Sequence, residues 1–399
     1  MIARKSFLII STHFFIVLLG WIGIVVLAKL WGGFAPSALG IIGFAMSFLS
    51  LFSIISDLGF SRAHVKRVSE GKDLGTCIGT FATIKLLLTS IMVLAIFASI
   101  YILKNVFHGG FYDATTESVI YVLVFHSVIT SLLSIALQTF IGKREIAKLQ
   151  TARMFENIVH VPLSIIVAIA GVNVMGWAIS PAVSWPEFLQ PLQRFLSDHA
   201  TGSLAFTYVV GIMGTFFVGL WLMRGNPIKK PSKEFAKSYS VFALPIMLSS
   251  IIGVISTNID KLTIGFFWTS VEVGYYFTVQ RVLSFIAILS TAVSTVLFPT
   301  ISSYHATKDY EKMKKSTLLA ERYISMVMIP PIIFIIVLAV PVIKIMLDEA
   351  FVPATSVLIL LAIWTLVRGM TIPYANLIGG MDKPGFLAKI SALTCTTNI

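Results

Sequence analysis

The stretch VFALPIMLSSIIGVISTNIDKLTIGFFW, residues 241–268, decides the fold class of this chain. A helix needs about 20 predominantly apolar residues to cross a hydrocarbon core about 30 Å thick, and this stretch exceeds that length. Asp260 and Lys261 interrupt it, although a charge near the middle of a membrane helix costs about 2.5–3.5 kcal/mol on insertion scales. Charges at that depth therefore indicate an internal ion pair or a functional site.

The composition extends the same conclusion to the whole chain. Hydrophobic residues make up 57% of the 399 residues and charged residues only 12%, against roughly 25% charged in soluble proteins. Apolar blocks recur at helix length without the alternation of barrel strands. We therefore predict an all-α polytopic membrane protein. Cys77 and Cys395 lie far apart and indicate neither a disulfide framework nor a metal site.

The apolar blocks predict ten spans and the start of an eleventh near Phe386. The first block is too long for the apolar core of a cleaved signal, which has about 7–15 residues, so it is expected to be retained. The predicted spans cover residues 6–29, 37–60, 76–103, 118–141, 158–180, 202–223, 241–268, 273–300, 323–346 and 355–378.

The connections between these spans alternate in charge, which predicts the orientation of the chain. Most of the 30 basic residues lie in one set of loops, which includes residues 62–72, 143–153, 224–237 and 308–322. Because cytoplasmic loops carry an excess of Lys and Arg, the amino terminus is expected in the cytoplasm. The same rule accounts for the net charge of +12, so nucleic acid is not expected as a partner.

The longest predicted outer connection is PAVSWPEFLQPLQRFLSDHATG, residues 181–202. Its apolar residues recur at roughly helical spacing between prolines. We expect a short helix that lies in the outer membrane interface rather than a catalytic site.

An internal repeat predicts the domain organisation. The segment that begins APSALGIIGFAMSF aligns with TSVEVGYYFTVQRVLSF, so that Gly40 falls on Gly274 and Lys72-Asp73 on Lys308-Asp309 with a two-residue slip. The offset spans six helices, and an even number gives both units the same orientation, with a pseudo-two-fold axis along the membrane normal. We predict one six-helix bundle over residues 1–223, a cytoplasmic linker over 224–240 and a second bundle over 241–399.

Three strings carry a resemblance to a known family. They are NIDKLTIGFFWTSVEVGYYFTVQRVLSF, the string SDLGFSRAHVKR in the first half, and IPYANLIGGMDKPGF near the end. Their order and spacing resemble the polysaccharide flippase branch of the multidrug/oligosaccharidyl-lipid/polysaccharide exporter superfamily, which includes O-antigen and oligosaccharide-lipid flippases. The resemblance implies a fold like that of MATE transporters, with twelve to fourteen helices and a central cavity open to one side at a time. Against that pattern the second bundle is expected to be incomplete here, with four full spans and part of a fifth.

The resemblance also implies a function, partners and a location. The function is to move a polyprenyl-(pyro)phosphate-linked oligosaccharide from the inner to the outer leaflet of the cell membrane. The implied partners are this lipid-linked oligosaccharide, membrane lipids and glycan polymerase or ligase machinery. No catalytic residue, metal site or cofactor is expected, and the chain contains no G-x-x-x-x-G-K-[ST] phosphate-binding loop.

Deep cations are the candidate substrate-binding residues. Arg281, Arg368, Lys85 and Lys261 are expected to line the cleft between the bundles and to hold phosphate, for which a guanidinium fork is well suited. Asp260 lies at the depth of Arg281 on the neighbouring helix. An ion pair between the two and a phosphate site at Arg281 remain compatible alternatives.

Two further residues and two other functions complete the prediction. His126 and Asn376 are secondary candidates, the former more typical of a hydrogen-bonded interior histidine. A MATE-type cation/drug antiporter is the alternative function, but it favours cavity carboxylates over cations. A membrane-embedded sugar polymerase would need paired carboxylates or a metal site, which the loops do not offer.

Overall fold

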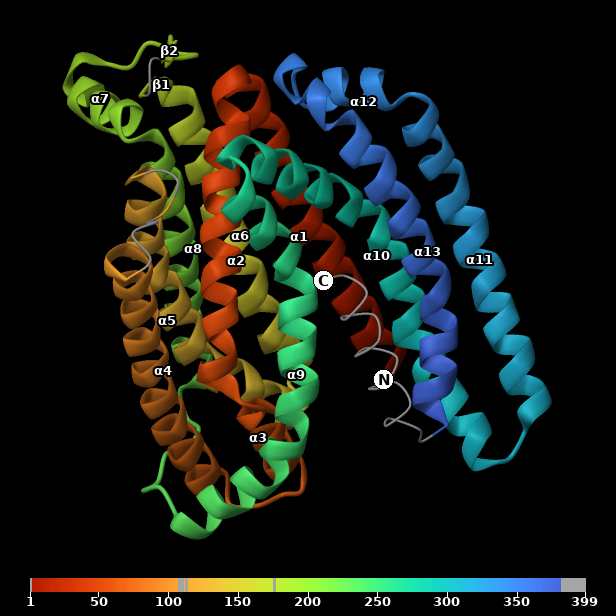
Figure 1. Ribbon diagram of the computed structural model, residues 1–399. Coiled ribbons are helices and arrows are strands. Elements are labelled where there is room, and N and C mark those ends of the chain that lie inside the picture. Colours follow the sequence, from red (N-terminus) through yellow and green to blue (C-terminus); the bar gives the residue numbers. More distant parts are fainter. Residues whose placement is uncertain (1, 107–110, 112–113, 175–176, 382–399) are drawn as a thin grey trace. The chain divides into compact units, whose positions relative to one another are not determined.

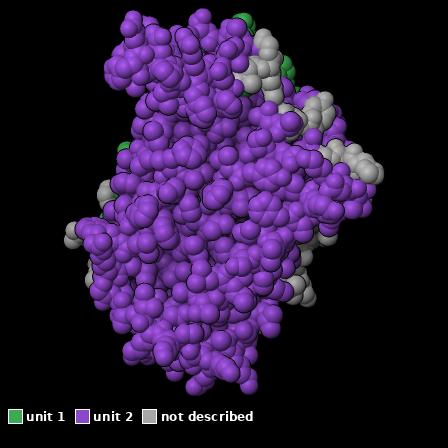
Figure 2. Space-filling model, turned by 90° about the vertical axis from the view of Figure 1, so that its left-hand side faces the viewer, with its two compact units in different colours: residues 1–36, 274–399 green, residues 37–273 purple. Residues whose placement is uncertain are grey.

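The computed structural model describes residues 2–106, 111, 114–174 and 177–381. The chain forms two compact units, one of residues 37–273 and one of residues 1–36 with 274–399. Figure 2 colours the first unit purple and the second green. The boundaries of these units differ from those of the predicted bundles, which cover 1–223 and 241–399 with a linker over 224–240. The two-bundle division remains a prediction.

Long α-helices make up most of the described residues, as Figure 1 shows. The predicted all-α membrane fold is therefore confirmed. The α-helices are α1 (Ile2–Trp31), α2 (Ala35–Asp57), α3 (Phe60–Ser69), α4 (Leu74–Asn105), α5 (Ala114–Gly142), α6 (Ile146–Ala170), α7 (Gln190–Asp198), α8 (Ala200–Met223), α9 (Lys233–Phe267), α10 (Ser270–Ala306), α11 (Tyr310–Val337), α12 (Ala339–Met346) and α13 (Thr355–Gly380). The shorter elements are the 3-10 helices η1 (Gly32–Phe34), η2 (Glu187–Leu189) and η3 (Glu349–Ala354), and a hairpin of β1 (Val172–Val174) and β2 (Trp177–Ile179).

Each of the ten predicted spans overlaps a long helix. Among the described residues, seven stretches are long and apolar enough to cross a membrane: Leu8–Asp57, Leu74–Asn105, Ala114–Gly142, Ile146–Ala170, Ala200–Met223, Tyr310–Val337 and Glu349–Gly379. α9 and α10 have 35 and 37 residues, more than the length that a span requires. The predicted eleventh span lies outside the described residues.

Two predicted spans have the wrong ends. The span predicted over 158–180 is α6, which begins at Ile146 and ends at Ala170, because Gly171 has a φ of 86° that favours glycine and a β-hairpin follows. The span predicted over 323–346 is two helices, α11 and α12, which break at Leu338. Pro341 lies in the first turn of α12, where its missing N–H removes no helical hydrogen bond.

The unit of residues 37–273 packs through small residues and close helix contacts. α8 packs against α5 and α6, and a Cβ at Gly211 would lie 3.0 Å from the carbonyl oxygen of Glu156. In lipid, where apolar surface alone drives little association, such close backbone approach is a main source of helix packing energy. Gly59, with a φ of 83°, turns the chain sharply between α2 and α3 and lies against the backbone of Ala243 in α9.

The other unit has a separate core around α10, α11 and α13. Leu297 and Ile301 of α10 pack with Met313 and Ala320 of α11. α1 joins this unit through Phe14, whose ring lies 5.6 Å from that of Phe285 in α10.

α4 and α11 begin with the same kind of cap. Asp73 caps α4, with its Oδ2 accepting a hydrogen bond from the backbone N–H of Thr76 at 2.8 Å. Asp309 caps α11 in the same way, accepting from the backbone N–H of Lys312 at 3.1 Å. These are the aspartates that the repeat aligns, and each satisfies a backbone donor that the helix itself leaves unpaired.

α9 begins the second half of that repeat, yet it packs on helices of the first half. Tyr239 and Ala243 of α9 share a buried cluster with Ala63 of α3 and Phe81 of α4. α1, which begins the first half, packs instead with α10. The first helix of each half therefore belongs to the unit that contains most of the other half.

His64 of α3 connects α5 and α9 through a fully buried hydrogen-bond network. The network lies near the basic loops that join α2 to α5. Its Nε2 lies 2.9 Å from Oγ1 of Thr139 in α5, and its Nδ1 lies 3.1 Å from the hydroxyl of Tyr239 in α9. The Thr139 hydroxyl donates to the carbonyl of Ile135, so it accepts from Nε2–H and leaves Nδ1 to accept from Tyr239. Burial lowers the pKa of His64 to about 3, because a charged imidazolium would lose its hydration there.

We expect stability to fall when the solution is acidified below pH 6.5. The unfolded chain binds a proton on His64 near its ordinary pKa of 6.5, whereas the folded chain does not bind it until about pH 3. Each pH unit in that window should therefore cost about 1.4 kcal/mol of unfolding free energy. Thermal unfolding of the purified protein between pH 7.5 and 5 measures it. His64→Gln should flatten this dependence and the exposed-site control His199→Gln should keep it; an equal slope in both variants contradicts the assignment.

Candidate functional site

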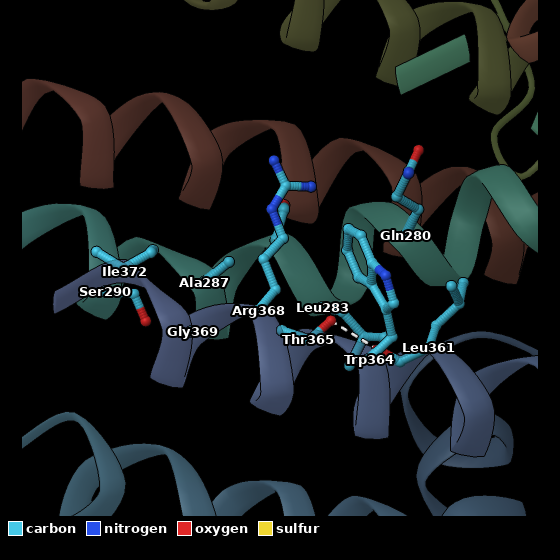
Figure 3. A pocket seen from close by; sticks show the side chains of 11 residues that line it. Gln280, Leu283, Ala287, Ser290, Leu361, Trp364, Thr365, Arg368, Gly369 and Ile372 are labelled. Atoms are coloured by element: carbon cyan, nitrogen blue, oxygen red, sulfur yellow. Dashed lines mark hydrogen bonds between the residues drawn. The ribbon is translucent and has the colours of Figure 1, made fainter. Parts of the chain in front are cut away.

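A cavity of about 280 Å³ lies between α10 and α13, within the unit of residues 274–399 and 1–36 (Figure 3). One face of each helix supplies its lining, at spacings of three and four residues that place side chains in a row. The lining residues are Gln280, Leu283, Ser284, Ala287 and Ser290 from α10, and Leu361, Trp364, Thr365, Arg368, Gly369 and Ile372 from α13.

Arg368 is the charged residue of this cavity. Its guanidinium carbon lies 4.8 Å from the centre of the Trp364 ring, one helical turn away, and Figure 3 shows the side chain extending from α13 toward α10. A guanidinium close to an indole ring gains a cation–π attraction that does not use its N–H donors. Those donors can therefore form bidentate hydrogen bonds to a phosphate or carboxylate.

The rest of the lining combines a few polar groups with apolar walls. Gln280, Ser284 and Thr365 present amide and hydroxyl groups, while leucine, alanine and isoleucine side chains surround them. Ligand sites have this character in general, because apolar walls strengthen the few polar contacts that orient the ligand. Gly369 lets α11 approach closely, since a Cβ there would lie 2.5 Å from Sδ of Met328.

Arg281, the other predicted arginine, lies on α10 next to Gln280 but outside the lining of this cavity. It is exposed, and its guanidinium carbon lies 5.2 Å from the centre of the Phe277 ring. Asp260 belongs to the unit of residues 37–273 and Arg281 to the other. The predicted pair between them stays a prediction.

Lys85 is buried, with 2% of its surface exposed, and is paired within its own unit. Its Nζ lies 2.8 Å from Oδ1 of Asp57 and donates to the carbonyl of Ser56 at 3.0 Å. The hydroxyl of Ser61 also donates to the same carboxylate oxygen. The contacts of Lys85 join α4 to the end of α2, and its role in a substrate cleft stays a prediction.

The remaining predicted residues are divided between the units. Lys261 is buried, and its Nζ donates to the carbonyl of Thr257 one turn earlier at 3.0 Å. His126 lies 3.5 Å from Glu156 Oε1 on α6. Asn376 is paired with Ser294 of α10 at 2.9 Å. Because Lys85 and Lys261 lie in one unit and both arginines in the other, a single cleft for all four cations remains a prediction.

Sequence reasoning missed Trp364 and Gln280 as parts of the site, and Asp57 as the partner of Lys85. Trp364 could have been found from its i, i+4 spacing to Arg368, which places both on one face of a helix. Asp57 ends a predicted span, and Lys85 of the next span reaches it.

The fold and this site first indicate the class of protein. Membrane-length helices that hold a cationic, aromatic cavity are typical of a transporter rather than an enzyme. The fold is that of the solved lipid II flippase MurJ in an inward closed conformation, with a TM-score of 0.72, 17% identity, and coverage of 98% of this chain and 80% of that one. It is also that of an inward-facing multidrug resistance MATE family transporter, with a TM-score of 0.67, 15% identity, and coverage of 95% and 83%.

The sequence then places the chain in a family. The profile described as "Polysaccharide biosynthesis protein" matches residues 26–184 and 196–356, so the chain belongs to that family. It is 22% identical over 399 residues to the probable low-salt glycan biosynthesis flippase Agl15 of Haloferax volcanii, covering all of this chain and 76% of the relative. It is 23% identical over 200 residues to the probable flippase AglR of the same organism, covering 50% of this chain and 41% of that protein. The resemblance to the polysaccharide flippase branch is therefore confirmed.

We expect removal of one member of the Lys85–Asp57 pair to destabilise the fold more than removal of both members. Asp57→Asn leaves a buried ammonium without its counter-charge and should cost about 3–5 kcal/mol, whereas the double variant Asp57→Asn/Lys85→Met should recover much of that loss. Thermal unfolding of four purified proteins, the wild type, Asp57→Asn, Lys85→Met and the double variant, measures the coupling. Additive effects of the two substitutions would contradict the pairing.

Proposed function

We propose that the chain is a flippase that moves a polyprenyl-(pyro)phosphate-linked oligosaccharide from the inner to the outer leaflet by alternating access. The observation that carries the proposal is the Arg368 guanidinium, stacked on Trp364 in a cavity between membrane-length helices. The family and the flippase names of the two Haloferax relatives support it.

The phosphate is the part of this substrate that Arg368 would hold. A planar guanidinium presents paired donors that match two phosphate oxygens, and weak hydration makes it easier than an ammonium to place at membrane depth. The apolar walls of the cavity exclude water and strengthen the contact. Gln280 and Ser284, on the opposite helix, can complete the hydrogen bonds of the anion.

The sugars need replacement partners, because each hydroxyl that enters hydrocarbon without a hydrogen bond costs several kcal/mol. Trp364 offers an aromatic face and an indole N–H, and Thr365 and Asn376 add polar groups on the same helix. The polyprenyl chain has no such requirement and can stay in lipid. The cationic, aromatic and polar groups therefore suit the phosphate and the sugars, and the polyprenyl chain needs no site in the cavity.

The other deep charges have proposed supporting roles. Arg281, which is exposed on the helix that supplies Gln280, would attract the anionic head group on its path. Lys261 would attract the phosphate by its positive charge, whereas Lys85 is paired with Asp57 within its own unit, and Asp260 would take part in ion coupling. His126 remains a secondary candidate for that coupling.

We further propose a cell-membrane location with a cytoplasmic amino terminus. The support is the charge of the connections: residues 62–72, 143–153 and 224–237 are rich in Lys and Arg and lie at one end of α2, α4, α5, α6, α8 and α9. Glycan polymerase or ligase machinery would receive the product on the opposite side.

Arg368→Ala should reduce delivery of lipid-linked glycan to the outer leaflet at least ten-fold, since a hydrogen bond to a charged group contributes about 1.5–3 kcal/mol. Arg368→Lys should keep part of the delivery, and Trp364→Ala should lose it more than Trp364→Phe. The measurement is surface glycan in a strain that lacks its own flippase, normalised to the amount of protein in the membrane.

The matched control for this test is Arg322→Ala, an exposed arginine on α11 outside the cavity, which should leave delivery unchanged. Arg281→Ala is expected to reduce delivery as well, but less than Arg368→Ala. Normal delivery by Arg368→Ala would remove the assigned role. A multidrug antiporter would instead raise resistance to cationic dyes without changing surface glycan.

The orientation predicts which side of the membrane each loop occupies. In a background with Cys77 and Cys395 replaced by serine, Ser184→Cys should react with a membrane-impermeant maleimide in intact cells. Lys230→Cys should react only after permeabilisation, because it lies in a basic loop. The opposite labelling pattern would reverse the proposed orientation.

A further inference from the structure

α7 and the β1–β2 hairpin form a second pocket, and none of the candidate site residues discussed above lines it. The pocket has a volume of about 240 Å³ and lies wholly within the unit of residues 37–273. Its lining comes from Ala170 at the end of α6, Asn173 of β1, Pro181, and the face of α7 that carries Gln190, Gln193, Arg194, Ser197 and Asp198. α7 and β1 lie side by side (Figure 1).

The sequence of α7 gives this helix one polar face and one apolar face. Gln190, Gln193, Arg194 and Ser197 recur at i, i+3, i+4 and i+7, which places them in one row along the helix. Leu192 and Phe195 lie on the other face and are exposed, as is Phe188 just before the helix, with 80% of its surface accessible. An apolar face of this kind is typical of a helix that lies in a membrane interface. The opposite, polar row lines the pocket beside the hairpin.

The hairpin holds the opposite wall in place. β1 and β2 pair antiparallel, with Asn173 opposite Ala178, and the backbone N–H of Ala182 donates to the carbonyl of Ile169 at 3.1 Å. The side-chain amide of Asn173 donates to Oδ1 of Asp198 at 3.2 Å, which orients both groups at the pocket. The wall opposite α7 therefore has a defined position.

The chemistry of the lining favours a neutral polyhydroxylated ligand. Amides offer donors and acceptors side by side, arginine offers donors and aspartate offers acceptors, so together they can match sugar hydroxyls, which both donate and accept. Arg194 and Asp198 cancel in charge, which disfavours an anion or a metal ion. The volume is below the range of about 300–1,000 Å³ that is usual for drug-sized ligands, and suits a single sugar ring.

We propose that this pocket binds one neutral sugar residue of a glycan on the side of the membrane that is proposed to be the outer one. The step from sugar to glycan cargo rests on the proposed function, whereas sugar binding itself does not. A weak site there would hold the head group after it has crossed and slow its return. Its position at the end of α6 and the beginning of α8 places it at the level of the lipid head groups.

The test uses the purified chain in lipid nanodiscs with the methyl α-glycosides of D-mannose, D-glucose and D-galactose as probes, together with methyl D-glucuronide. Saturation-transfer NMR at millimolar probe is expected to detect at least one neutral glycoside and to give a weaker signal with the glucuronide. Gln193→Ala and Asn173→Ala should each reduce the signal at least five-fold. Gln193 lies on a surface helix, so its variant tests the proposal even if Asn173→Ala fails to fold.

Two controls separate this proposal from the flippase proposal. Glu187→Ala removes a side chain of similar length from the same segment but outside the pocket, and should leave the signal unchanged. Arg368→Ala should also keep sugar binding while it loses delivery. Absence of any neutral glycoside signal, a stronger signal with the glucuronide, or equal signals in the wild type and Gln193→Ala would overturn the pocket assignment without affecting the flippase proposal.

Discussion

The hydrocarbon core of a membrane offers no hydrogen-bond partner, and this constraint governs both the fold and the candidate site. Every backbone group at membrane depth must be satisfied within its own helix, which explains why the apolar blocks form long helices. Charged side chains at the same depth must also find partners. Lys85 meets this requirement through Asp57 and the carbonyl of Ser56, and thereby joins α4 to α2, which α3 separates along the chain.

Arg368 meets the same constraint in a different way. It stacks on Trp364, which accommodates the positive charge while leaving the guanidinium donors available toward a cavity. Lys85 is enclosed by its ion pair and is therefore suited to stability. Lys85 therefore has a counter-charge and Arg368 an aromatic ring, although sequence alone treats both as deep charges.

The grouping of helices does not follow the order of the chain. α9 packs on α3 and α4 through Tyr239 and Ala243, and its neighbour His64 lies in a network in which every polar atom described has a partner. α1 packs in the other unit through Phe14 and Phe285. The chain passes from one unit to the other between residues 36 and 37 and between residues 273 and 274.

The sequence by itself determined the fold class, the ten long helices, the short helix before residue 200 and the presence of charges at depth. These follow from length, apolar content and the 3.6-residue period, which are local properties of a chain in lipid. It failed at the ends of α6 and α11, where Gly171 and Leu338 end the helices within chain that is still apolar enough to continue. Only the tertiary structure decided that Lys85 meets Asp57, that Arg368 lines a cavity with Gln280, and that α9 packs on α3 and α4. Those outcomes depend on which faces of distant helices meet, and apolar helices without a polar face carry no periodic signal that specifies their neighbours.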